Sequence, residues 1–125
     1  MNIKKAADLT DLSADTIRYY ERVGIIGPVP RLENGIRDFG ERSINQLNFA
    51  RIMRNAGMSI ELLKQYIDLI YADDDQTIPA RKEMLQEAAD EMDSKIEKLT
   101  TARDYLNHKI QNYYGHMRDT ERNLF

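Results

Sequence analysis

An apolar stripe with alternating steps of four and three residues runs along the C-terminal part of the chain and limits its possible folds more than any other feature. Its members are Leu85, Ala89, Met92, Ile96, Leu99, Arg103, Leu106, Ile110, Tyr113 and Met117, of which Arg103 alone is charged. A heptad stripe of this length is typical of a coiled coil. A continuous helix from Thr77 to Tyr114 would be about 55–60 Å long at 1.5 Å per residue.

Residues 1–71 can close only a small core, which cannot cover a helix of that length. We therefore predict that the stripe from Leu85 to Tyr113 is the interface of a homodimer. The alternative is a helix that lies on its own domain. The periodicity alone does not distinguish a parallel pair of helices from an antiparallel one.

The composition excludes several chemistries. The chain has no cysteine, which removes disulfides, thiol nucleophiles and thiolate metal sites. Its two histidines, His108 and His116, lie too far apart along a helix to hold one metal ion. No group of residues has catalytic spacing, and the run 73–75 of aspartates reads more simply as a polar linker. We expect no enzyme activity, no cofactor and no metal site.

The net charge of −3 does not by itself favour nucleic acid as a partner. Residues 1–71 hold ten Lys and Arg against nine Asp and Glu, and residues 72–125 hold eight against twelve. Any DNA-binding surface must therefore depend on where the basic residues stand. The start of the chain lacks a hydrophobic stretch of signal-peptide length, and no run of 18 apolar residues occurs, which predicts a cytoplasmic protein without a membrane segment.

The first 24 residues predict two short helices joined by a tight turn. The first covers Ile3–Leu9, and Asp11 is a residue type that tolerates a left-handed turn. Ser13 is a good N-cap for a second helix that reaches about Val23, and Gly24 is suited to end it. This order is typical of a helix-turn-helix.

The next segment predicts a wing, and two further helices follow it. Asn34-Gly35 favours a type I′ turn, which would pair 29–33 with 36–39 as a two-stranded ribbon. A third helix is predicted over 41–56, and a fourth begins after Ser59. We expect a mainly α fold with a winged helix-turn-helix and helix pair over 1–71, a linker over 72–76, a dimerisation helix over 77–118 and a tail over 119–125.

Basic and hydroxyl side chains share one face of the second predicted helix. Arg18 and Arg22 are four residues apart, with Thr16 and Tyr19 beside them, and Arg37 adds a cation after the hairpin turn. Arginines and hydroxyls are the donors that a helix uses toward phosphates and base edges in a major groove. The alternative is a solvated helix face with internal salt bridges.

Three stretches resemble the mercury-resistance-regulator (MerR) family of transcription regulators. They are Thr16-Ile17-Arg18-Tyr19-Tyr20-Glu21, Gly24-Ile25-Ile26 and Asn34-Gly35-Ile36-Arg37-Asp38-Phe39. The resemblance covers the whole chain in the same order of elements. The stretch from Met53 to Glu61 is similar to the aldehyde- and electrophile-responsive branch.

The resemblance implies a homodimer joined by an antiparallel coiled coil. Such dimers bind double-stranded promoter DNA whose spacer is too long for RNA polymerase, and they bend and untwist it into register. The expected DNA contacts are Ser13, Thr16, Arg18, Tyr19, Arg22, Arg37 and Phe39. The alternative is a DNA-architectural or protein-interaction module on the same fold that does not remodel a promoter.

The chain departs from the family pattern at three positions. Asp11 stands where glycine is frequent, and Phe39 stands where tyrosine is common. Ile52 occupies the place of the cysteine of the electrophile-responsive branch, so thiol alkylation cannot be the switch. We also expect no separate drug-binding domain after the coiled coil. A small-molecule effector, if there is one, would bind between the fourth helix and the partner's long helix, with Tyr66, Ile70, Tyr71 and Met84 as candidate contacts.

Overall fold

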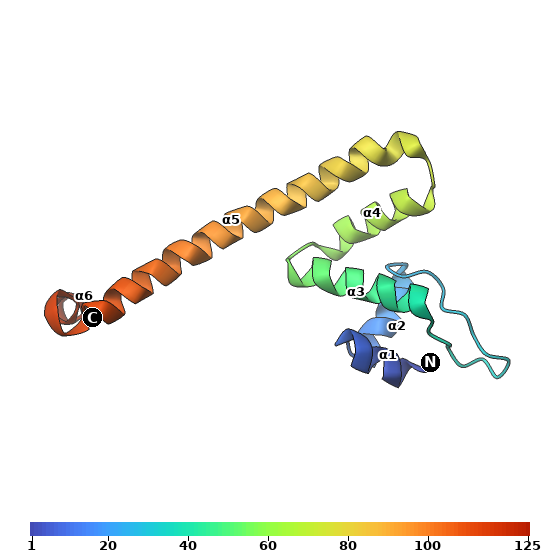
Figure 1. The fold of residues 1–125 in the computed structure, drawn as a ribbon, viewed down its shortest axis with the longest axis horizontal. Coiled ribbons are helices and arrows are strands. Elements are labelled where there is room, and N and C mark those ends of the chain that lie inside the picture. Colours follow the sequence, from blue (N-terminus) through green and yellow to red (C-terminus); the bar gives the residue numbers. More distant parts are fainter. The chain divides into compact units, whose positions relative to one another are not determined.

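The computed structural model describes all residues from Met1 to Phe125, and they form two compact units, Met1–Leu85 and Gln86–Phe125. The first unit contains four helices, namely α1 (Ile3–Thr10), α2 (Ala14–Val23), α3 (Glu41–Asn55) and α4 (Ile60–Tyr71), followed by a 3₁₀ turn over Asp75–Thr77 (Figure 1). The chain then continues as α5 (Ile78–Gln111), a π-helical turn over Tyr113–Met117 and α6 (Arg118–Leu124). None of these helices is both long enough and apolar enough to cross a membrane.

The turn between α1 and α2 has the expected geometry. Asp11 adopts a left-handed conformation with φ 56° and ends α1. The Ser13 hydroxyl accepts the backbone N–H of Thr16 at 3.1 Å and caps α2. Gly24 ends α2 with φ 83°, a value that other residues rarely adopt. The helix-turn-helix predicted from these residues is confirmed.

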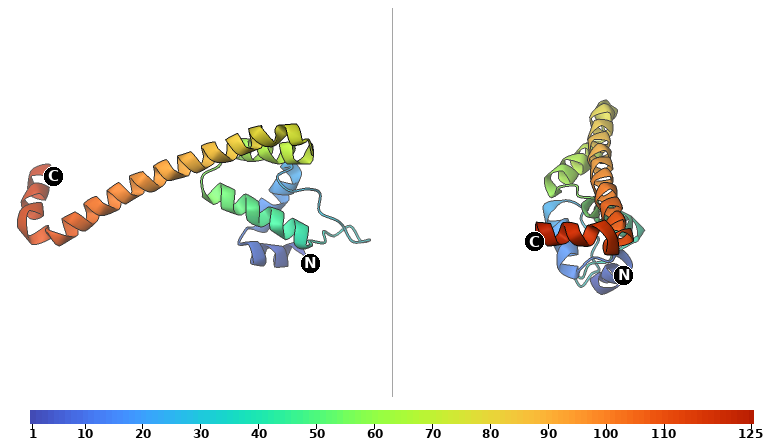
Figure 2. Two further views of the ribbon diagram at one scale, coloured as in Figure 1. Left: turned by 45° about the horizontal axis from the view of Figure 1, so that its top comes forward. Right: turned by 90° about the vertical axis from the view of Figure 1, so that its left-hand side faces the viewer.

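Helix α3 lies in the middle of the first unit, with α1 on one side and α4 on the other (Figures 1 and 2). Its Leu47 is fully buried, and so are Ile17 of α2 and Leu63 of α4. The largest fully buried side chain is Phe39, which comes from the segment between α2 and α3. Each helix therefore contributes one apolar side to a shared core, as the spacing of these residues predicts.

The predicted two-stranded wing is wrong. The segment between α2 and α3 is a hairpin loop without strands, and Arg31 and Arg37 form its lone antiparallel bridge. Gly35 has the positive φ of a hairpin turn, but Asn34 does not, and the side chain of Asn34 instead accepts the N–H of Ile36 at 3.1 Å. Prolines at 28 and 30 have no N–H to donate, so a longer ladder cannot form on that arm.

The second unit ends in a turned-back helix and not in the expected straight one. Helix α5 stops at Gln111, and Gly115 has a non-helical backbone conformation. Helix α6 then folds back on the end of α5 (Figure 2), where Lys109 Nζ lies 2.7 Å from Glu121 Oε2. Tyr113 and Met117 therefore leave the predicted stripe, and Met117 is buried within this turn. A glycine weakens a helix interior, which is consistent with a break at this point.

Within the single chain, the stripe of α5 is open to solvent. Ile96 is 60% exposed and Leu99 71% exposed, and Leu106 and Ile110 are exposed as well. The one buried residue of α5 is Ala88, whereas Ala89, the expected stripe member, is exposed. Arg103 pairs with its neighbour Asp104 at 3.2 Å. An apolar stripe of this extent is unusual for a surface that faces water permanently.

Replacing Phe39 by alanine tests the burial of the hairpin's second arm. Because Phe39 is 1% exposed, the Phe39→Ala variant should lose about 3–5 kcal/mol of unfolding free energy, as buried aromatic truncations do. Urea denaturation followed by circular dichroism measures this loss. Ile36→Ala, a truncation on the exposed part of the same loop, is the control and should change stability by less than about 1 kcal/mol. Equal losses in the two variants would contradict the burial of Phe39.

Candidate DNA-binding surface

Helix α2 divides its side chains between a buried face and an exposed one. Ile17 and Tyr20 enter the core, so Arg18 and Tyr19 point outward. Arg18 Nη1 lies 3.0 Å from Asp15 Oδ1, one turn earlier on the same helix. The guanidinium of Arg22 lies over the ring of Tyr19, 5.3 Å from its centroid. The predicted cationic face is therefore present and exposed.

The start of α2 places two hydroxyls beside this face. Ser13 Oγ donates to Thr16 Oγ1 at 2.9 Å while it accepts the N–H of Thr16. The hydroxyl of Ser13 is therefore mainly engaged in capping. A helix start with partly unsatisfied N–H groups and adjacent hydroxyls is suited to a phosphate oxygen.

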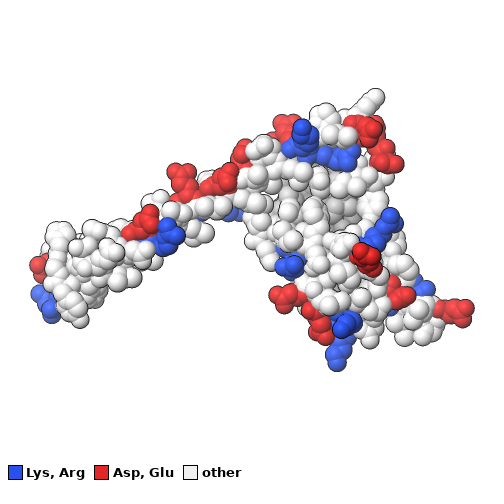
Figure 3. Space-filling model, viewed as in Figure 1, with Lys and Arg blue, Asp and Glu red and all other residues white.

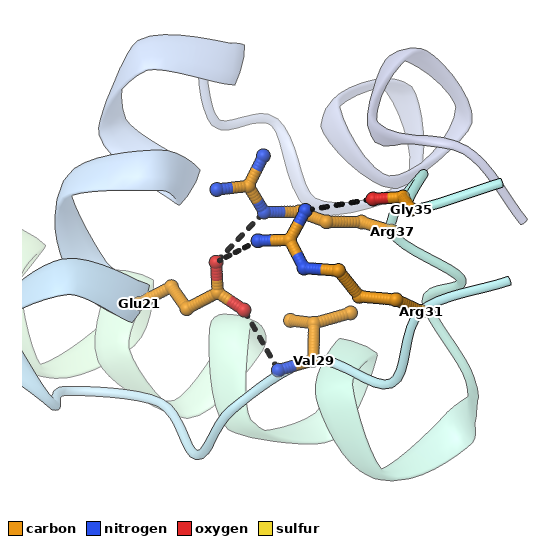
Figure 4. A network of polar contacts seen from close by, with 5 residues as sticks. All are labelled: Glu21, Val29, Arg31, Gly35 and Arg37. Carbon is orange, nitrogen blue, oxygen red and sulfur yellow. Dashed lines mark hydrogen bonds and ion pairs between the residues drawn. The ribbon is translucent and has the colours of Figure 1, made fainter. Parts of the chain in front are cut away.

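A carboxylate joins α2 to the hairpin loop, and the sequence did not single it out as a functional residue. Glu21 Oε2 accepts the backbone N–H of Val29 at 2.7 Å, and Oε1 accepts Arg37 Nε at 2.7 Å (Figure 4). Arg31 Nη2 lies 3.6 Å from the same Oε1. An internal salt bridge of the kind considered from the sequence does occur on α2, but it joins Arg18 to Asp15, whereas Glu21 pairs with the hairpin loop.

The surroundings of Glu21 shift its pKa. Burial raises the pKa of this carboxyl, but the hydrogen bond from Val29 and the contacts with Arg37 and Arg31 outweigh burial, so the net pKa lies below its ordinary value. The carboxylate is thus ionised in the folded protein at neutral pH. One signal in the sequence indicated that Glu21 faces inward. It stands four residues after the buried Ile17, beside the core-facing side of α2.

Phe39 cannot contact DNA through its side chain, which corrects its predicted place in the site. The ring is buried in the core, and the backbone N–H of Phe39 donates to the carbonyl of Met1 at 2.7 Å. An aromatic ring at the end of the hairpin loop fills the space beside α3 more favourably than it would face water. Arg37, two residues earlier, remains partly exposed.

Charge is distributed without a large basic area. Acidic and basic side chains are interspersed over the face seen in Figure 3, and no continuous basic patch appears there. Any attraction to DNA would therefore have to depend on individual cations, such as those on α2 and the hairpin loop, as the near-neutral charge of residues 1–71 predicts.

Of the four candidate effector residues, two line a hollow in the first unit and two do not. Ile70 and Tyr71 line a hollow of about 400 Å³ in the first unit, together with Ile25, Arg42, Asn45, Gln46, Phe49 and Ile67. Tyr66 packs against Phe49 with ring centroids 5.9 Å apart and is not part of the lining, and neither is Met84. No cluster of histidines and carboxylates has the arrangement of a metal site.

The sequence matches two family models. The model of the MerR helix-turn-helix regulatory proteins matches residues 1–70, and a model described as MerR, DNA binding matches residues 44–109. The regulator AdhR of Bacillus subtilis is 48% identical over 78% of this chain, which covers 66% of AdhR. The regulator HmrR of Rhizobium leguminosarum is 36% identical over 94% of this chain and 90% of HmrR. These relatives are named as transcription regulators and not as enzymes.

Two solved structures share the fold over nearly the whole chain. A MerR family regulator from Listeria monocytogenes superposes with a TM-score of 0.84 and 41% identity, covering 99% of this chain and 93% of its own. HiNmlR, described as a MerR family regulator that lacks the sensor domain and is bound to promoter DNA, superposes with a TM-score of 0.83 and 28% identity. That superposition covers 91% of this chain and 86% of HiNmlR.

The lowered pKa of Glu21 predicts how its contribution to stability changes with pH. Because the folded-state pKa lies below the ordinary value of 4.5, the contacts of the carboxylate stabilise the fold above pH 4.5. This contribution is lost as the pH falls through the folded-state pKa. The difference in unfolding free energy between the wild type and Glu21→Gln, measured in urea from pH 7 to pH 3, should therefore shrink below pH 4.5. A difference that stays constant to pH 3 would contradict the assignment.

Proposed function

Because the chain belongs to the MerR family of helix-turn-helix regulators, we propose that it binds promoter DNA as a homodimer and remodels an over-long promoter spacer for RNA polymerase. The exposed face of α2 beside the hairpin loop carries this proposal. The likeness to HiNmlR, a structure of a regulator on promoter DNA, supports the same use of these elements. The energy for bending and untwisting the duplex would come from contacts that form only with the deformed DNA.

The proposed DNA contacts lie on two elements of the first unit. On α2, Arg18, Tyr19 and Arg22 would reach the major groove, while Ser13 and Thr16 would approach a phosphate at the helix start. In the hairpin loop, Arg37 would meet a neighbouring phosphate. Phe39 supports this loop from the core and is not proposed as a contact.

The proposed dimer interface is the stripe of α5. Leu85, Met92, Ile96, Leu99, Arg103, Leu106 and Ile110 would face an antiparallel copy of the same helix, with Ala89 at its edge. Exposed apolar side chains along α5 support this interface, since burying them would remove a large apolar area from water. Residues 1–71 would bind DNA, residues 72–76 would link the two parts, and α5 would dimerise. Tyr113 lies beyond the end of α5 and is not included in the proposed interface.

Replacing Arg18 tests the recognition helix. The Arg18→Ala variant should bind weakly to a duplex that the wild type protects in a footprint of the region upstream of its own coding sequence. The loss should be about tenfold or more, because one arginine contact to a base or phosphate disappears from each subunit. Arg118→Ala, which removes an exposed arginine of α6, is the matched control and should bind as the wild type does. Equal affinity of all three proteins would contradict the role of Arg18.

Replacing Leu99 tests the dimer. A carboxylate at the centre of an apolar interface would be buried without a partner, so Leu99→Asp should be monomeric at concentrations where the wild type is dimeric. Sedimentation velocity measures the two species. Thr101→Asp introduces the same charge at an exposed position of α5 outside the stripe and should remain dimeric. A dimeric Leu99→Asp protein would place the interface elsewhere.

A further inference from the structure

We infer that Glu21 is a positioning residue for DNA recognition. Its carboxylate sets Arg37 beside α2 and leaves the two terminal nitrogens of that arginine free to bind a phosphate. The inference rests on the proposed function, because it requires α2 and the hairpin loop to face the same duplex. The inference gives an acidic residue a role in binding a polyanion, although the negative charge of Glu21 by itself would weaken that binding.

The hairpin loop has little structure of its own to hold it in place. A single bridge between Arg31 and Arg37 joins its two arms, through hydrogen bonds from the Leu32 N–H to the Ile36 carbonyl and from the Asp38 N–H to the Pro30 carbonyl. One further backbone hydrogen bond, from Gly35 to Leu32, closes its tip. A two-stranded hairpin is marginally stable in water even with a full ladder, and this one has none. The position of the loop relative to α2 must therefore depend on contacts with the rest of the first unit.

Glu21 supplies such contacts from α2. Its side chain is 13% exposed and reaches both arms of the loop, through the backbone N–H of Val29 on the first arm and Arg37 on the second. Arg31 braces the tip, since its Nη1 donates to the carbonyl of Gly35 at 3.1 Å while its Nη2 faces Glu21. All five residues of this network lie together in Figure 4.

Glu21 binds Nε of Arg37, which determines the nitrogens of this guanidinium that remain available to another partner. The carboxylate accepts Nε of Arg37, and neither terminal nitrogen of this guanidinium has a protein partner. In Figure 4 both terminal nitrogens point away from Glu21. Arginine presents several donors in a rigid fork, so one edge can bind a carboxylate while the outer donors bind a phosphate. A lysine could not serve both partners in this fixed geometry.

The direction in which Glu21→Gln changes DNA affinity distinguishes a positioning role from a purely electrostatic effect. If charge alone governed binding, Glu21→Gln would raise DNA affinity, because it removes a negative charge near phosphates. If Glu21 positions Arg37, the same substitution lowers affinity. Glu33→Gln removes an equal charge from an exposed position of the same loop and is the matched control.

The experiment uses the full chain and a duplex that the wild type enriches from a random-sequence library. At a salt concentration where all variants are folded by circular dichroism, Glu21→Gln should bind about tenfold more weakly. The slope of log affinity against log salt should fall by about one per lost phosphate contact. Glu33→Gln should bind as well as the wild type or better. Arg37→Ala should add little to the loss in the Glu21→Gln background, since coupled residues are not additive.

Arg37→Lys gives a second measurement that does not depend on the folding of the Glu21 variant. It should lose about as much affinity as Arg37→Ala, although it keeps the charge. Wild-type affinity in Arg37→Lys, additive losses in the double variant, or tighter binding by Glu21→Gln would each overturn the role of Glu21 while leaving the proposed function intact. Failure of the wild type to enrich any duplex would overturn the proposed function, and the role of Glu21 with it.

Discussion

The exposed apolar stripe of α5 is the constraint on which the rest of this protein depends. Helix α5 has 34 residues, about 50 Å at 1.5 Å per residue, and most of its stripe has no partner in the same chain. In the proposed dimer, a second copy of the helix would remove this surface from water. A twofold pair would also present two recognition helices to one duplex, which is the arrangement that matches an inverted repeat in DNA.

Each subunit would recognise DNA through only a few charged side chains. The first unit is near neutral, so affinity cannot come from a broad basic surface. In the proposed complex it would come instead from a small number of cations whose positions are fixed, with Arg18 and Arg22 held on a capped helix and Arg37 held by Glu21. An ionised carboxylate with a lowered pKa is compatible with this design because it is shared between a backbone N–H and two guanidinium groups.

Local signals predicted the framework well. The Ser13 cap, the left-handed Asp11 and the terminal Gly24 give the helix-turn-helix its boundaries, because each acts through neighbours within one turn. The same kind of reasoning failed in the hairpin loop. Asn34-Gly35 favours a tight turn, but the prolines before it prevent a ladder, so the expected ribbon is a loop with a single bridge. Near the C-terminus the apolar spacing continues through Tyr113 and Met117, yet the backbone turns at Gly115.

By itself, the sequence determined the helical periodicities, the apolar stripe of the long helix, the cationic face of α2 and membership of a regulator family, here without the cysteine that a thiol-based signal would need. These features depend on spacing along the chain, which is visible without coordinates. Only the tertiary structure decided that Phe39 fills the core, that Glu21 holds Val29 and Arg37, and that α6 turns back on α5. Such contacts join residues eight or more positions apart, and their formation depends on packing in three dimensions, which no local pattern specifies.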